Sequence, residues 1–289
     1  MGKTLINIED DKFGLKTILH IIVGCLIFAI SQLTASIVVD TFYKLTKFNF
    51  LSPYVMLRCL FEIGLFYLIM RFYIYRVLKL NFTYFRITKP RVSLLWIVIA
   101  LLLPFTVILY YFTFVNGKLI YGASNTILLN ITFALKAGLS AGIIEEFFFR
   151  GFTMKLVENR WNSKIAIIIP SVTFASLHLI KDMDSSSILL LLIAGTTAGV
   201  MFSMITYYSN NIWNSVIVHA VWNMLIIGIF HISSQSDLIT VFNYVFENQN
   251  ILITGGKFGI EASLPAIIGY ITVITITIAI KNKKSLAPK

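Results

Sequence analysis

Long apolar runs separated by short polar segments dominate the chain. A helix that crosses a bilayer needs about 20 mainly apolar residues. Runs that approach or exceed this length cover residues 15–39, 53–75, 92–114, 126–157, 164–180, 188–209, 211–233 and 260–280. The pattern therefore predicts an all-α fold, a polytopic transmembrane helix bundle of about eight spans.

The basic residues favour one set of the connections between these runs. About 15 lysines and arginines fall on the side that holds both termini, against about 5 on the other side, and such a bias marks the cytoplasmic face. We therefore expect both termini to be cytoplasmic.

Composition agrees with a membrane protein. Hydrophobic residues make up 57% of the chain and charged residues 13%, whereas soluble domains average about a quarter charged residues. The net charge of +11 does not indicate nucleic acid, because the basic residues lie at the ends of apolar runs and form no soluble face. The predicted partner is the lipid bilayer, and we expect no nucleic-acid partner.

The chain divides into three parts by the position of its polar motifs. Residues 1–125 hold three predicted spans, residues 126–233 hold the four spans that carry the motifs described below, and residues 234–289 hold a polar external connection and the last span. Residues 76–91 mix basic and aromatic side chains. They are interpreted as a cytoplasmic segment against anionic headgroups, or equally as ordinary anchoring residues.

Two adjacent glutamates interrupt the fourth apolar run. Glu146 and Arg150 are four residues apart with the acid first, which is the favoured order for a helical ion pair. That pair can neutralise itself in a low-dielectric environment. Glu145 points about 100° away from Glu146 on a helix and has no such local partner. The sequence therefore predicts a structural pair and one carboxylate that projects into a cavity.

Three further polar residues lie at a similar depth. His178 closes the segment F-A-S-L-H in the fifth run, and His219 and Asn223 share one helical face in the seventh. At about 1.5 Å per residue, these groups and Glu145 lie roughly 12 to 21 Å from the cytoplasmic ends of their helices. A lone intramembrane histidine is more often a packing residue than a catalyst, so the convergence of four groups carries the prediction of one polar site.

Other features of the spans are interpreted as structural. Arg58 and Glu62 form a second pair in the less favoured order, with a structural or gating role, and Lys136 is expected to extend toward the interface. The spacings Gly138–Gly142 and Gly195–Gly199 predict that the fourth and sixth spans pack tightly.

The order of these motifs resembles a known family. E-E-F-F-F-R at 145–150, F-A-S-L-H at 174–178 and H-A-V-W-N at 219–223 are similar to the E-E-x-x-x-R, F-x-x-x-H and H-x-x-x-N/D motifs of the CAAX protease and bacteriocin-processing family, also called CPBP or Abi. Type II CAAX prenyl endopeptidases belong to it. The resemblance covers residues 145–223, and the flanking spans match only as apolar helices.

The resemblance implies an intramembrane endopeptidase with a peptide or membrane-protein substrate. It implies that Glu145 is the catalytic carboxylate and that His178 helps it to activate water. His219 and Asn223 would stabilise the oxyanion, and Glu146 and Arg150 would support the site. Amide hydrolysis does need a base, an oxyanion donor and an acid for the leaving amine.

Alternatives for the cofactor and the function stay open at this point. The favoured mechanism requires no cofactor, but Glu145, His178 and His219 also form a ligand set that suits Zn²⁺, although no H-E-x-x-H is present. The expected setting is bacterial peptide processing, bacteriocin self-immunity or signalling in the plasma membrane. The alternatives are a non-catalytic immunity or scaffold protein that binds a peptide, and a proton-coupled transporter, against which we find no internal repeat.

Overall fold

The computed structural model describes residues 14–286 except 48–49, 123–125, 238 and 249. Each predicted apolar run contains a helix, so the predicted all-α membrane bundle is confirmed as a fold class. The helices are α1 (Leu15–Thr46), α2 (Leu51–Phe72), α3 (Leu94–Phe114), α4 (Ile127–Glu145), α5 (Met154–Arg160), α6 (Ser163–Ser176), α7 (Ser185–Ser209), α8 (Trp213–Asn223), α9 (Ile251–Thr254) and α10 (Leu264–Leu286).

Length and composition set the membrane-crossing potential of each helix. In the described part of the chain, five helices are long and apolar enough to cross a membrane: α1, α3, the continuous helix Ile127–Arg160, α7 and Leu264–Asn282 of α10. The helices at Ser163–Ser176 and Trp213–Ile229 are apolar but shorter. The chain is an integral membrane protein, and the number of eight spans stays a prediction.

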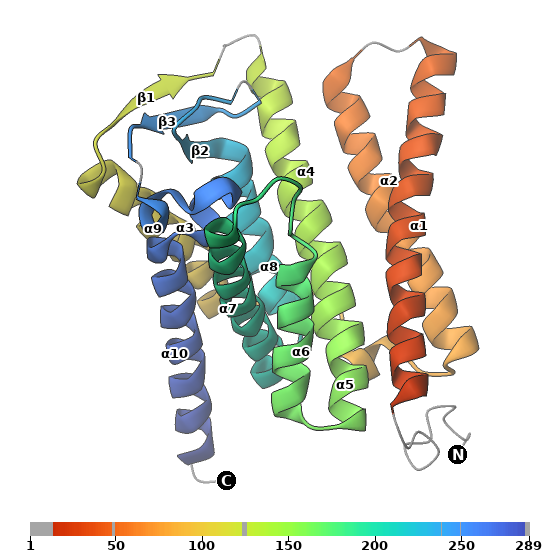
Figure 1. The fold of residues 1–289 in the computed structure, drawn as a ribbon. Coiled ribbons are helices and arrows are strands. Elements are labelled where there is room, and N and C mark those ends of the chain that lie inside the picture. The colour runs from red at the N-terminus through yellow and green to blue at the C-terminus, as the bar shows by residue number, and fades with distance from the viewer. Residues whose placement is uncertain (1–13, 48–49, 123–125, 238, 249, 287–289) are drawn as a thin grey trace.

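The helices are arranged as a bundle with a central group of motif-bearing helices (Figure 1). α1 and α2 form a hairpin on one flank, α3 and α10 lie on the other, and α4, α6, α7 and α8 lie between them. α1 begins and α10 ends at the same end of the bundle. This arrangement agrees with termini on one side of the membrane, and the side itself stays a prediction. The outermost basic residues counted in that prediction, among them Lys3, Lys12 and Lys289, lie outside the described residues.

A small sheet caps the opposite end of the bundle. Its strand order is β1 (Gly117–Tyr121), β3 (Phe242–Phe246), β2 (Phe230–Ser233), with β1 antiparallel and β2 parallel to β3. The predicted seventh span, 211–233, is therefore too long, because its last residues leave the helix to pair with β3. The hydrogen bond from Tyr244 Oη to the carbonyl of Val115 (2.7 Å) ties this sheet to the end of α3.

The segment between α2 and α3 is part of the core. Phe82, Phe85 and Ile87 are buried in the same cluster as Phe152, and Arg86 Nη2 lies 2.7 Å from Glu158 Oε2 of α5. These residues face the protein, and the interpretation of 76–91 as a segment on headgroups stays a prediction for its exposed basic residues, among them Lys79 and Lys89. The buried aromatic side chains of this segment are apolar enough to pack against the motif helix, and Arg86 is paired within the protein.

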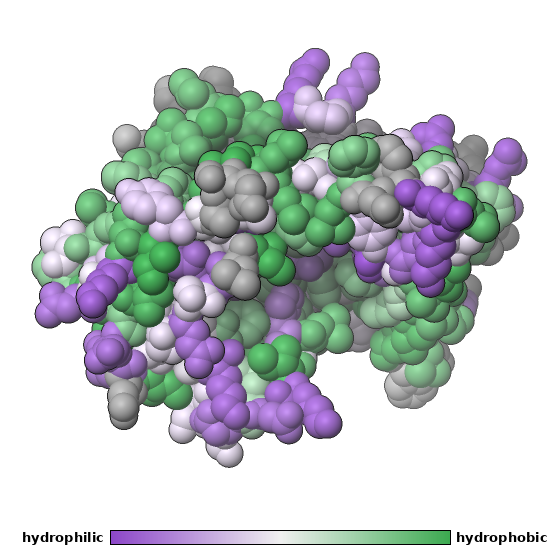
Figure 2. Space-filling model, turned by 90° about the horizontal axis from the view of Figure 1, so that it is seen from above, coloured by the Kyte–Doolittle hydropathy of each residue, from purple (hydrophilic) through white to green (hydrophobic). Residues whose placement is uncertain are grey.

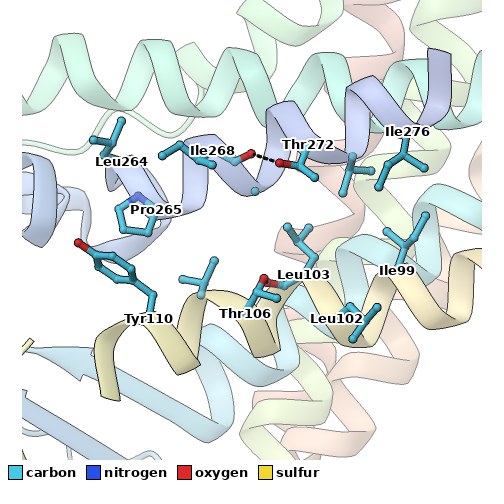
Figure 3. Close-up of a pocket in the computed structure, with 13 residues that line it drawn as sticks. Ile99, Leu102, Leu103, Thr106, Tyr110, Leu264, Pro265, Ile268, Thr272 and Ile276 are labelled. Atoms are coloured by element: carbon cyan, nitrogen blue, oxygen red, sulfur yellow. Dashed lines mark hydrogen bonds between the residues drawn. The ribbon is translucent and has the colours of Figure 1, made fainter. Parts of the chain in front are cut away.

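The outward helix faces are apolar, as expected for surfaces in contact with lipid. Leu26 of α1, Leu101 of α3 and Ile268 of α10 are each more than half exposed. Seen from the sheet end, the molecule mixes hydrophilic and apolar residues on that face (Figure 2). Between α3 and α10 lies an apolar cavity of about 500 Å³, across which Leu103 and Ile268 lie on facing helices (Figure 3). It contains no residue of the three motifs.

Candidate active site

Two of the three motifs lie where an α-helix turns into a π-helix. Glu145 is the last residue of α4, and the π-helix Glu146–Thr153 begins at the next residue. Asn223 likewise ends α8, and the π-helix Met224–Ile229 follows it. The wider i to i+5 turn is rare and is frequent at functional sites. It changes the angular spacing along each helix, so side-chain directions here differ from those of an ideal α-helix.

The predicted pair of Glu146 and Arg150 is present in the centre of the bundle. Arg150 Nη1 lies 3.0 Å from Glu146 Oε1, and both side chains are 0% exposed. The guanidinium also lies over the rings of Phe174 and Phe202, at 4.4 and 5.2 Å from their centroids. The arginine is thus held by a carboxylate and two aromatic faces, which offset the cost of burying its charge.

His219 connects this pair to Glu145. Its Nδ1 lies 2.9 Å from Glu146 Oε1, and because a carboxylate only accepts, Nδ1 carries the proton and donates it. Its Nε2 lies 3.9 Å from Glu145 Oε2. The ring of Phe202 stacks on the imidazole at 4.6 Å. The buried pair therefore fixes the orientation of His219, a contact that the sequence did not indicate.

Glu145 differs from Glu146 in being partly exposed, since the side chain of Glu146 is completely buried. The Glu145 side chain is 19% exposed, and its Oε2 is buried without a hydrogen-bond partner in the described part of the chain. A buried carboxylate oxygen without a donor is costly. It is the arrangement expected of a group that meets a water molecule or a substrate.

His178 is placed at the end of α6 with one nitrogen occupied. Its Nδ1 lies 2.7 Å from the carbonyl oxygen of Phe174, so Nδ1 carries the proton and Nε2 of the neutral ring is free to accept. His178 forms no ion pair with either motif glutamate among the described residues, and His219 is the histidine that approaches Glu145. The predicted role of His178, which is to help Glu145 activate water, stays a prediction.

A cavity of about 250 Å³ brings the remaining predicted groups together. His178, His219 and Asn223 line it, along with apolar side chains of α6, α7 and α8. Glu145 adjoins this group through His219. Three helices that are far apart in the sequence thus direct polar groups to one place.

Close helix packing at glycines sets these positions. A Cβ atom added at Gly142 would lie 2.8 Å from the Cβ of Ala220, beside His219, so α4 and α8 approach closely. A Cβ at Gly199 would lie 2.7 Å from that of Ser171, which brings α7 onto α6. The predicted tight packing is confirmed, with a different neighbour for each glycine pair.

Whether Glu145, His178 and His219 hold Zn²⁺ stays a prediction. In the part of the chain that the structure describes, no group of three or more His, Cys, Asp or Glu side chains is arranged to hold a metal. His219 already uses Nδ1 for Glu146, and its Nε2 lies 3.9 Å from Glu145. We derive no step that uses a metal.

Glu261 also lines the cavity and was missed by the sequence analysis. It lies in the turn Ile260–Ala262, before α10 and outside the helices that are long enough to span a membrane. Burial raises the pKa of the Glu261 carboxyl, and a hydrogen bond from Trp222 opposes that rise. The feature of the sequence that could have indicated Glu261 is its position as a single carboxylate in the apolar run 260–280.

Comparison with known proteins gives a family. No curated protein matches the chain, and no solved structure matches it. Residues 127–225 match the model of a family described as type II CAAX prenyl endopeptidase Rce1-like. The match begins at α4, ends just after α8, and contains all three motifs. Through these helices, whose motif residues meet around one buried site, the chain is similar to the type II CAAX prenyl endopeptidase family.

Proposed function

We propose that the chain is an intramembrane endopeptidase that hydrolyses a peptide bond with water activated by Glu145. The observation that carries this proposal is the partly exposed carboxylate of Glu145, whose Oε2 lies 3.9 Å from a histidine that a buried ion pair holds in place. The match of residues 127–225 to the family model supports the same reaction class.

In the proposed first step, Glu145 takes a proton from water, and the remaining hydroxide adds to the peptide carbonyl carbon. A carboxylate near the reacting water is a suitable general base. The free Nε2 of His178 accepts a hydrogen bond from the same water and orients it, since Nδ1 is held by Phe174. This assigns His178 to the water rather than to direct contact with Glu145.

Negative charge that develops on the carbonyl oxygen needs donors. The Asn223 amide supplies one, and His219 supplies Nε2–H when both of its nitrogens are protonated. The contact of His219 Nδ1 with Glu146 orients the imidazole so that Nε2 lies on the side of Glu145.

The intermediate then collapses. The carbon–nitrogen bond breaks, and Glu145 passes the proton that it took from water to the leaving amine. The products are a new carboxylic acid and a new amine, so one water molecule is consumed per bond. Glu145 returns to its starting form.

The proposed setting is the plasma membrane of a bacterium, with a peptide or membrane-associated protein as the substrate. The abundance of isoleucine, phenylalanine, lysine and asparagine in the sequence supports this setting by composition alone. The proposed roles are peptide processing, bacteriocin self-immunity or signalling.

The test compares cells that carry wild type, Glu145→Gln, Glu247→Gln or no gene. Glu247→Gln is the matched control, because it makes the same chemical change at an exposed position. We expect products seen with wild type and Glu247→Gln to fall by about 100-fold or more with Glu145→Gln, as for loss of a general base. New peptide termini are measured by mass spectrometry, and membrane abundance by immunoblot.

Equal products from Glu145→Gln and wild type, at equal abundance, would contradict the assignment. The chain would then act by binding a peptide, and its motif residues would have a structural role.

A further inference from the structure

Glu261 is a carboxylate in the wall of the cavity, outside all three family motifs. The turn that carries it follows a glycine-rich stretch in which Gly255, Gly256 and Gly259 all adopt positive φ values. Only glycine adopts such angles without strain. The backbone is therefore shaped to bring residues 258–261 back onto the bundle, where Phe258 and Glu261 form part of the cavity wall.

Two aromatic residues hold Glu261 in position. Trp222 Nε1 donates to Glu261 Oε1 at 3.0 Å, and Tyr270 Oη donates to the Glu261 carbonyl at 3.1 Å. The rings of Trp222 and Tyr270 contact each other with centroids 5.2 Å apart. Both residues also line the cavity. The carboxylate is thus fixed from α8 and α10, and its orientation does not depend on a flexible loop.

Among the described residues, no Lys, Arg or His side chain forms an ion pair with Glu261. Lys257, in the same loop, donates instead to the carbonyl of Asp182. Arg150 is already paired with Glu146. Among the described residues that line the cavity, the acidic one is Glu261, and the basic ones are the two histidines, His178 and His219.

Glu261 also lies where two cavities meet. A second cavity of about 350 Å³, on the sheet side, is lined by polar residues including His231, Asp237 and Lys257. Ile227, Phe258 and Glu261 belong to the walls of both cavities. A peptide that extends from the sheet side toward His178 and His219 therefore passes the Glu261 carboxylate.

We propose that Glu261 determines specificity by binding a lysine or arginine side chain of the substrate next to the cleaved bond. The inference rests on the proposed peptidase function. A half-buried carboxylate that accepts from one neutral donor and forms no ion pair with a described residue gains most from a charge-assisted hydrogen bond. A substrate with a basic residue at this position supplies that bond, and an acidic residue there is repelled.

The test measures binding, so that it does not depend on cleavage. The probes are two five-residue peptides with blocked ends, Phe-Phe-Xaa-Phe-Phe, in which Xaa is lysine or its uncharged analogue norleucine. Affinity is measured by competition in detergent for wild type, Glu261→Gln, Glu145→Gln and Glu247→Gln. The glutamine side chain keeps an oxygen that can accept the hydrogen bond from Trp222 Nε1. A thermal unfolding curve for each variant verifies that it is folded.

We expect wild type to prefer the lysine peptide by about 10-fold, the size typical of a charge-assisted hydrogen bond. Glu261→Gln should lose this preference, whereas Glu145→Gln and Glu247→Gln should retain it. Equal affinity for both peptides in wild type, or a preference that survives in Glu261→Gln, would overturn the proposal.

The outcome separates this inference from the proposed function. A lysine preference that depends on Glu261, in a protein that makes no Glu145-dependent product, would reject the peptidase and keep the cation site. Glu145-dependent products without that preference would keep the peptidase and reject the role of Glu261.

Discussion

Two Arg–Glu pairs with the same helical spacing have opposite environments in this molecule. Glu146 and Arg150 are completely buried among the motif helices. Arg58 and Glu62 lie between α2 and α4, where Arg58 is 32% exposed and Glu62 only 3%. In the second pair Glu62 also contacts Lys136 Nζ at 3.3 Å, so it has two cations and Glu146 has one arginine.

The difference shows that spacing alone does not give the role of an ion pair. Lys136 was expected to extend toward the interface, and instead it crosses from α4 to α2 to reach Glu62. Ser140 adds a hydrogen bond to the other oxygen of Glu62 at 2.9 Å. This cluster is a redundant link between two helices. Glu146, by contrast, has one arginine partner among the described residues, and it also orients His219.

The largest effect should follow removal of the fully buried cation. Arg150→Met leaves Glu146 without its arginine, and breaking a buried pair from one side typically costs about 3 to 5 kcal/mol. We expect the variant to be nearly absent from the membrane. Abundance by immunoblot and thermal unfolding in detergent measure this loss.

The double variant Arg150→Met with Glu146→Gln is the matched control for the unpaired charge. It should recover part of the stability, because no lone buried charge remains. Normal stability of Arg150→Met alone would show that the buried pair does not stabilise the fold.

A smaller effect should follow the same kind of change in the second pair. Arg58→Gln leaves Glu62 with Lys136 and Ser140, and a partly exposed ion pair is typically worth about 1 kcal/mol or less. The expected result is a folded protein with a small decrease in unfolding temperature and retained activity. A loss as large as that of Arg150→Met would remove the contrast between the two clusters.

The smallest effect should follow metal removal. His219 Nδ1 donates to Glu146, and Nε2 lies 3.9 Å from Glu145. The proposed mechanism needs no metal. Dialysis against a strong chelator is therefore expected to leave product formation unchanged. The control is dialysis against chelator that is already saturated with metal. Loss of activity that Zn²⁺ restores, and that this control does not cause, would replace the proposed mechanism with a metal-dependent one.

The sequence predicted the fold class and much of the candidate site for physical reasons that act locally. Apolar runs long enough to cross a bilayer specify helices, and the spacing of Glu146 and Arg150 specifies their pair. Similar depth was enough to predict that His178, His219 and Asn223 would approach one another. The catalytic roles of these residues stay predictions, as does the division of the chain into 1–125, 126–233 and 234–289.

Other features could not be read from local pattern. The sheet depends on pairing between β1, β2 and β3, which lie more than 100 residues apart at the extremes. Residues 234–259 resembled a polar connection, yet their last part returns to the bundle with Phe258 at the site. Burial of Phe82, Phe85 and Ile87 similarly depends on the aromatic cluster around Phe152, a long-range contact.

By itself, the sequence determined that this chain forms membrane helices and that four polar groups lie at one depth, because hydrophobic length and helical rise are properties of the local chain. Only the tertiary structure decided which groups touch. In the tertiary structure His219 lies near both glutamates, His178 Nδ1 donates to the carbonyl of Phe174, and Glu261 lines the cavity. These outcomes depend on helix rotation, on π-helical turns and on close packing at Gly142 and Gly199, which act between segments distant in the sequence.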